Sequence, residues 1–208
     1  ICIEQGEQWL HDFPLFLGIN KKNPPQIAIW LEDTQGNYLS TVYVTHKIAT
    51  QSWQASGGNR RKEALPHWCY SRGVKYDDGL YLPTKKEPLI DGISGATPHE
   101  SFNIKLNPAT ALKKFVVKIE INHSTDFNEA FPKSAKDGEA NYSGGKEGSR
   151  QPAIVYAANV DLSSGEKSFE ANLMGHSSPD GSSGEVNKDT SGLTTALHIV
   201  KRITVIIQ

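Results

Sequence analysis

The chain has 208 residues, a length that suits one large domain or two small ones. Its 22 Lys and Arg residues balance 23 Asp and Glu residues, which excludes the strongly basic surface typical of nucleic-acid-binding proteins. Hydrophobic residues make up 37% of the chain, yet no apolar run approaches the roughly 20 residues that span a bilayer. The composition therefore predicts a domain with a buried core, no nucleic-acid partner and no membrane span.

Short segments rich in β-branched and aromatic residues follow one another along the chain, separated by turn residues. Gln26–Glu32 alternates isoleucine and leucine with alanine and tryptophan, a turn follows over 33–37, and 38–46 returns as a second strand. We expect these two strands to form a hairpin. Further strands are predicted at 1–5, 15–19, 101–106, 115–122, 154–162, 168–174 and 202–207.

Seven or eight strands without alternating helices predict an all-β fold, an immunoglobulin- or fibronectin-III-like antiparallel β-sandwich. We expect one domain over 1–208, with two long insertions at about 50–98 and 123–152. The first insertion is rich in aromatic residues and is expected to pack on the sandwich, with a short helix near 59–65. In the second insertion, the polar segment 133–150 is expected to be mobile.

The sharpest motif is DGISGAT over 91–97, which resembles the acceptor pattern of proteins that receive FMN covalently on a Thr hydroxyl. Such a transfer needs an exposed hydroxyl with small neighbours, and Gly95 and the alanine after it supply those neighbours for Thr97. The resemblance implies a covalent FMN held by Asp91, Ser94, Gly95 and Thr97. A tight loop that leads into the next strand, with Asp91 and Ser94 capping turn amides, explains the same residues without a cofactor.

The chain also resembles a bacterial periplasmic domain-of-unknown-function family of immunoglobulin-like domains. Two motifs carry this resemblance, and they occur in the same order as in the family: the strand IWLED at 29–33 with Gly36 after it, and the loop at 91–97. The resemblance covers about 25–122. Members of that family are often encoded beside flavin transferases and membrane-anchored PepSY-type proteins. The resemblance thus implies an extracytoplasmic location and a membrane-anchored redox or cell-envelope protein as partner. Because the chain opens directly in a strand, we expect any export signal to have been removed.

The first insertion also carries Trp53, Trp68 and Tyr70, with His67 beside them. Aromatic rings offer large flat surfaces with a polar edge, so these four residues are candidates for binding a sugar or a peptide. The same rings serve equally well to anchor a long connection to a sheet. His67 and Cys69 stand two positions apart and no second pair follows, so they do not form a zinc-binding spacing.

The segment 180–189 offers side-chain oxygens of the kind that calcium binds. A solvated turn explains this composition equally well. The residues concerned are Asp180, Ser182, Glu185, Asn187 and Asp189.

The sequence contains no nucleophile elbow, phosphate-binding loop or dinucleotide fingerprint, so no catalytic residue is predicted. Cys2 and Cys69 are too few for a disulfide scaffold, and their spacing leaves their pairing open. The sequence therefore predicts a non-enzymatic, extracytoplasmic accessory or binding module, associated with flavin-dependent electron transfer through Thr97. The alternative is a carbohydrate- or peptide-binding module that uses the aromatic residues of 53–81.

Overall fold

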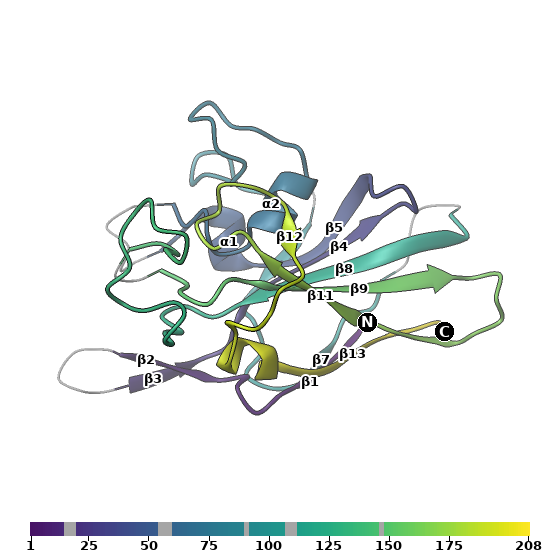
Figure 1. Cartoon of the computed structure of the whole chain (residues 1–208). Coiled ribbons are helices and arrows are strands. Elements are labelled where there is room, and N and C mark those ends of the chain that lie inside the picture. The colour runs from purple at the N-terminus through teal and green to yellow at the C-terminus, as the bar shows by residue number, and fades with distance from the viewer. Residues whose placement is uncertain (15–19, 54–59, 90–91, 107–111, 146–147) are drawn as a thin grey trace.

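The computed structural model describes residues 1–14, 20–53, 60–89, 92–106, 112–145 and 148–208. Two main β-sheets lie one above the other (Figure 1), so the predicted all-β sandwich is confirmed. Within the described residues, helix is confined to α1 (His46–Thr50), α2 (Pro66–Ser71) and one 3₁₀ turn (Thr195–His198). None of the helices in this part of the chain has the length and apolar character needed to cross a membrane.

The larger sheet has seven strands, in the order β12 (Val186–Asn187), β11 (Asn172–Ser177), β9 (Ile154–Asp161), β8 (Lys114–Asn122), β4 (Gln26–Glu32), β5 (Tyr38–Thr45) and β6 (Ile93–Gly95). The smaller sheet has four, in the order β10 (Ser168–Glu170), β13 (Val200–Ile206), β1 (Cys2–Gln5) and β7 (Phe102–Asn103). A separate hairpin joins β2 (His11–Pro14) and β3 (Asn20–Asn23). Paired strands run antiparallel except β5 and β6, which run parallel.

The core between the two sheets is built from alternate residues of the central strands. The isoleucines and the leucine of β4 are buried there together with Val117, Ile119 and Ile121 of β8. Because successive side chains of a strand point to opposite faces, the residues between them, among them Trp30 and Glu120, lie on the outer face of the larger sheet. That outer face also carries the polar side chains of Glu32 and Lys118.

The predicted hairpin is confirmed, since β4 pairs with β5 in antiparallel register. Its turn is closed by the Asp33 carboxylate, whose Oδ1 accepts the backbone N–H groups of Gln35 and Asn37 at 2.9 Å each. Gly36 adopts a φ of 86°, a conformation that glycine takes without a steric penalty. The DTQGN sequence is therefore explained by local turn geometry.

The first insertion covers the outer face of the larger sheet, where α1 and α2 lie above β4 and β8 (Figure 1). Trp30 of β4 packs there in a second apolar cluster with Ile48 of α1 and with Leu65 and Trp68 of the insertion. The prediction that this aromatic insertion packs on the sandwich is confirmed. The molecule therefore has three layers: the smaller sheet, the larger sheet and the insertion.

Several predicted elements differ from the structure, and the strand predicted over 101–106 is shortened to β7. The described residues of the predicted helix near 59–65 form turns, and α2 begins instead at Pro66, a residue favoured in the first helical turn. The predicted strand over 168–174 is divided at Ala171, because β10 pairs with β13 in the smaller sheet whereas β11 pairs with β9 in the larger one. The predicted strand over 15–19 lies outside the described residues.

The second insertion contributes to the packed protein. Ser143, Ser149 and Arg150 are buried, and a β-bridge joins Arg150 to Asp126. These contacts mean that the described part of 133–150, predicted to be mobile, includes side chains enclosed by the rest of the chain.

Candidate functional site

The loop that resembles an FMN acceptor lies at the edge of the larger sheet. Ser94 and Gly95 belong to β6, and Asp91 lies outside the described residues. Thr97 is only 5% exposed. Its hydroxyl donates a hydrogen bond of 2.7 Å to the carbonyl of Pro25, and it lies 2.9 Å from the hydroxyl of Thr45.

These contacts assign a structural role to Thr97. Its hydroxyl joins the residue before β4 to the last residue of β5, so it is neither exposed nor free of partners. The prediction that Thr97 presents an open hydroxyl to a flavin transferase is therefore wrong for the folded chain. The buried Thr97 hydroxyl does not fit the role of acceptor in the folded chain, whereas a tight loop that enters the sandwich accounts for its contacts.

The aromatic residues of the first insertion anchor it to the sheet. Trp53 and Trp68 are buried, and Nε1 of Trp68 donates a hydrogen bond of 3.0 Å to the hydroxyl of Thr41. The prediction that the two indoles form a ligand platform is therefore wrong. Tyr70 is half-buried and stacks on Tyr81, with their ring centroids 4.3 Å apart.

His67 lies beside two charged residues that the sequence analysis did not select, Lys118 and Glu32. Its Nδ1–H donates to the carbonyl of Gly184 at 2.7 Å, so Nε2 is the acceptor that faces Nζ of Lys118 at 3.3 Å. Lys118 Nζ also lies 3.6 Å from Oε2 of Glu32, whose Oε1 accepts the indole N–H of Trp30 at 2.8 Å. Burial lowers the pKa of His67, which favours the neutral ring that this arrangement needs.

Glu120 connects the larger sheet to the start of α2. It is completely buried, and its carboxylate accepts the backbone N–H groups of His67 at 3.1 Å and Trp68 at 2.8 Å. Burial raises the pKa of Glu120 to about 7. Burial also raises the pKa of the adjacent Cys69 thiol, and both Cys69 and Cys2 are free thiols. Because its polar groups are satisfied inside the protein, this cluster holds α2 on the sheet.

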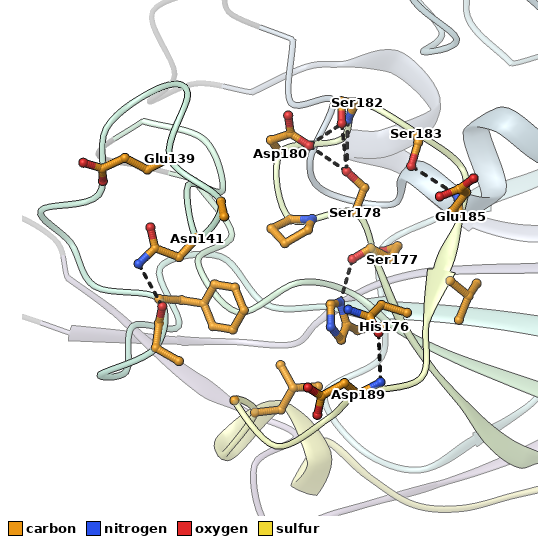
Figure 2. Close-up of a pocket in the computed structure, with 18 of the residues that line it drawn as sticks. Glu139, Asn141, His176, Ser177, Ser178, Asp180, Ser182, Ser183, Glu185 and Asp189 are labelled. Atoms are coloured by element: carbon orange, nitrogen blue, oxygen red, sulfur yellow. Dashed lines mark hydrogen bonds between the residues drawn. The ribbon is translucent and has the colours of Figure 1, made fainter.

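A polar groove opens elsewhere, between the second insertion and the segment that follows β11 (Figure 2). Its volume is about 870 Å³. One wall is formed by residues between 130 and 141 and the other by residues between 176 and 193. A cleft of this size matches the range of small-molecule and peptide sites.

The described lining of the groove is negatively charged. Its described lining contains four carboxylates, those of Glu139, Asp180, Glu185 and Asp189, and neither Lys nor Arg. His176 is the basic side chain in this lining. Since the chain as a whole is nearly neutral, the negative character of the groove is local.

Local hydrogen bonds keep two of these carboxylates ionised. Burial alone raises the pKa of Asp180, but hydrogen bonds from the Ser178 hydroxyl at 2.6 Å and the Ser182 N–H at 3.0 Å outweigh it and leave the pKa below its usual value. The N–H of Ser191 donates to Asp189 at 3.0 Å and lowers the pKa of that carboxyl. Both groups therefore carry negative charge at neutral pH.

The wall at 178–185 is held against α2 by residues of the first insertion. The hydroxyl of Tyr70 donates to the carbonyl of Ser182 at 2.7 Å, and His67 donates to the carbonyl of Gly184. A Cβ on Gly184 would lie 2.4 Å from Cβ of Tyr70, so only glycine permits this approach. Two predicted ligand-binding residues, His67 and Tyr70, thus support the groove from outside.

The proposed calcium ligands of 180–189 lie in this wall, where several of them close turns. Oδ1 of Asn187, for example, accepts the N–H of Asp189 at 2.9 Å. Among the described residues, no group of three or more His, Cys, Asp and Glu side chains is placed to hold a metal ion. The hydrogen bonds that close these turns support the solvated-turn explanation for this segment.

The groove itself was not predicted as a site. Its acidic residues come from segments about 40 residues apart in the chain, and only the sandwich brings these segments together. The signal available in the sequence was the run of Asp, Glu and Ser residues in the second of them. Comparisons with protein-family models, with curated proteins and with solved structures found no match to this chain.

Proposed function

We propose that this chain is a non-enzymatic binding module whose polar groove takes a positively charged ligand. The observation that carries the proposal is the lining of the groove, with four carboxylates and neither Lys nor Arg among its described residues. A cleft lined with charges of one sign concentrates ligands of the opposite sign and increases their rate of association.

The state of the carboxylates supports a cationic ligand. Glu185 forms neither a hydrogen bond nor an ion pair through its carboxylate with the other described residues, so it is available to a ligand. Asp180 and Asp189 stay ionised because of their local hydrogen bonds. The groove is a partly open cleft of about 870 Å³, which suits a segment of a basic peptide as well as a small amine.

The chemistry of the lining supports binding over catalysis. The Nδ1–H of His176 is bonded to the backbone carbonyl of Ser177, and Nε2 of the ring forms no hydrogen bond with a serine hydroxyl among the described residues. The Ser177 hydroxyl donates to the carbonyl of Ala153 at 3.2 Å. Among the described lining residues, no serine hydroxyl is therefore hydrogen-bonded to the imidazole, and the Ser178 hydroxyl is bonded to the carboxylate of Asp180.

Fluorescence anisotropy tests the proposal with a labelled heptapeptide that alternates glycine with lysine, and with its glutamate counterpart. We expect the lysine peptide to bind and its affinity to fall as salt is raised from 20 to 300 mM, because the contacts are charge pairs. The double variant Glu185→Gln, Asp189→Asn is expected to weaken binding roughly five- to tenfold, from two partly exposed charge pairs.

The matched control removes two carboxylates outside the groove, Glu87→Gln and Glu166→Gln, both of which are exposed. This control is expected to bind as the wild type does. Binding of the glutamate peptide, binding of a neutral oligosaccharide in place of the lysine peptide, or equal losses in both double variants would contradict the proposal.

A further inference from the structure

His176 gives the groove a specific hydrogen-bonding group in addition to its charge. The imidazole lines the groove but is only 6% exposed. Its Nδ1 lies 2.8 Å from the backbone carbonyl of Ser177. A carbonyl oxygen only accepts, so Nδ1 carries the hydrogen, and in the neutral ring Nε2 is then a lone-pair acceptor.

The Nε2 acceptor has no partner among the described residues, because the bond to Ser177 is the ring's one hydrogen bond there. Nε2 of His176 is not one of the buried side-chain atoms that lack a partner among the described residues, so it is accessible from the groove. A ligand in the groove that brings an N–H or O–H donor can therefore bond to it. The imidazole is therefore an observation independent of the acidic residues around it.

Two donors in the lining of the groove are already used within the protein. The Ser178 hydroxyl donates to Asp180, and the N–H of Asp189 donates to Asn187. The carboxylates and Nε2 of His176 remain as acceptors. The groove is thus complementary to a ligand group that is both positively charged and rich in N–H donors.

From this arrangement we infer that the groove selects a protonated amine or guanidinium that still carries N–H hydrogens, with Nε2 of His176 as the specificity-determining acceptor. This inference rests on the proposed function and adds which kind of cation the groove selects. Charge alone would accept a quaternary ammonium as readily as a primary one, whereas an unpaired acceptor distinguishes the two.

The test compares four versions of one heptapeptide, in which a central lysine is unmodified, monomethylated, dimethylated or trimethylated. All four carry the same charge, but the number of N–H donors falls from three to none. Binding of all four peptides is measured by anisotropy in the same buffer. We expect affinity to fall along the series, with the trimethylated peptide at least about tenfold weaker than the unmodified one.

Two variants of His176 test whether its Nε2 atom causes the preference for peptides with more N–H donors. In His176→Asn the amide nitrogen takes the place of Nδ1 and still reaches the Ser177 carbonyl, but the acceptor at Nε2 is lost. In His176→Gln the amide oxygen takes the place of Nε2. We expect the Asn variant to bind all four peptides within about twofold, and the Gln variant to keep most of the preference. His99→Asn, at an exposed site outside the groove, is the control.

The outcomes separate the two proposals. If the wild type binds all four peptides equally, the groove takes cations and the inference about His176 is overturned. A preference that persists in the Asn variant overturns it as well. If none of the four peptides binds to the wild type, the proposed function itself is wrong. The comparison within the wild type needs no substitution and so does not depend on how a variant folds.

Discussion

The hydroxyl of Tyr70 in α2 donates a hydrogen bond of 2.7 Å to the backbone carbonyl of Ser182 in the wall of the groove. This bond spans 112 positions of the sequence and joins the outer layer of the molecule to the candidate site. The shape of the groove therefore depends on the packing of the first insertion, although neither Tyr70 nor any other described residue of that insertion lines the groove.

Replacing Tyr70 by Phe tests this dependence. Loss of one hydrogen bond at a half-buried position is expected to lower the free energy of unfolding by about 1 kcal/mol. Hydrogen exchange of the backbone amides in 178–185 is expected to become faster. Tyr81→Phe is the matched control. Tyr81 stacks on Tyr70, but its hydroxyl forms no hydrogen bond with the other described residues. Equal effects of the two variants would show that the Ser182 bond is not responsible.

The buried carboxyl of Glu120 makes the stability of the protein depend on pH. Its pKa is raised from 4.5 to about 7 in the folded state, so the folded protein binds more protons than the unfolded chain between these values. The contribution of Glu120 is therefore expected to fall as pH rises from about 4.5 to 7, by roughly 3 kcal/mol in total, and then to level off.

Urea denaturation of the wild type and of Glu120→Gln at pH 5, 6, 7 and 8 measures this effect. The difference between their free energies of unfolding is expected to change with pH in favour of the wild type at pH 5. A difference that stays constant from pH 5 to 8 would mean that Glu120 does not titrate in this window.

His123 has the opposite effect at lower pH. It is buried and donates from Nε2 to the carbonyl of Gln8 at 2.8 Å, and burial lowers its pKa to about 3. Between about 3 and 6.5 the unfolded chain binds more protons, so this contribution to stability falls as the pH drops through that range. His123→Gln keeps a donor near Gln8 and is expected to lose less stability than the wild type between pH 6 and 4 in thermal melts. Parallel losses in the two proteins would rule out His123 as the source.

Thr97 offers a test of its structural role and of the flavin prediction together. Thr97→Val keeps the shape of the side chain but leaves the Pro25 carbonyl and the Thr45 hydroxyl without a partner at that point. We expect a loss of about 1–3 kcal/mol in the free energy of unfolding. Thr84→Val, at a half-buried site in a turn, serves for comparison and is expected to cost less, near 1 kcal/mol.

The wild-type protein and Thr97→Val also test whether Thr97 is modified with FMN. Because the Thr97 hydroxyl is buried and hydrogen-bonded, the intact mass of the folded wild type is expected to be unchanged after incubation with a flavin transferase and its flavin donor. A mass gain of one FMN group that is lost in Thr97→Val would instead show that the loop opens to the enzyme.

Sequence patterns predicted the central strands well. β4 agrees with its predicted bounds, and β8 and β9 differ from theirs by one residue at an end. These predictions succeed because the alternation of apolar residues and the turn chemistry at Asp33 and Gly36 are local properties of the chain. The same local pattern did not reveal that the chain changes sheets at Ala171, since each half of 168–174 is apolar enough for either sheet.

The sequence alone therefore determined the class of fold, the central hairpin and the presence of an aromatic insertion that needs a surface to cover. Whether a side chain is exposed was decided by the tertiary structure. Thr97 and Trp68 are enclosed by segments far away in the chain, and Lys118 lies under α2 although it occupies a strand position that usually faces water. The groove arose in the same way, because the segments that carry Glu139 and Asp189 line one cleft only when the sandwich is complete. Strand periodicity acts over a few residues, whereas burial and the gathering of charges depend on contacts between segments that the sequence separates widely.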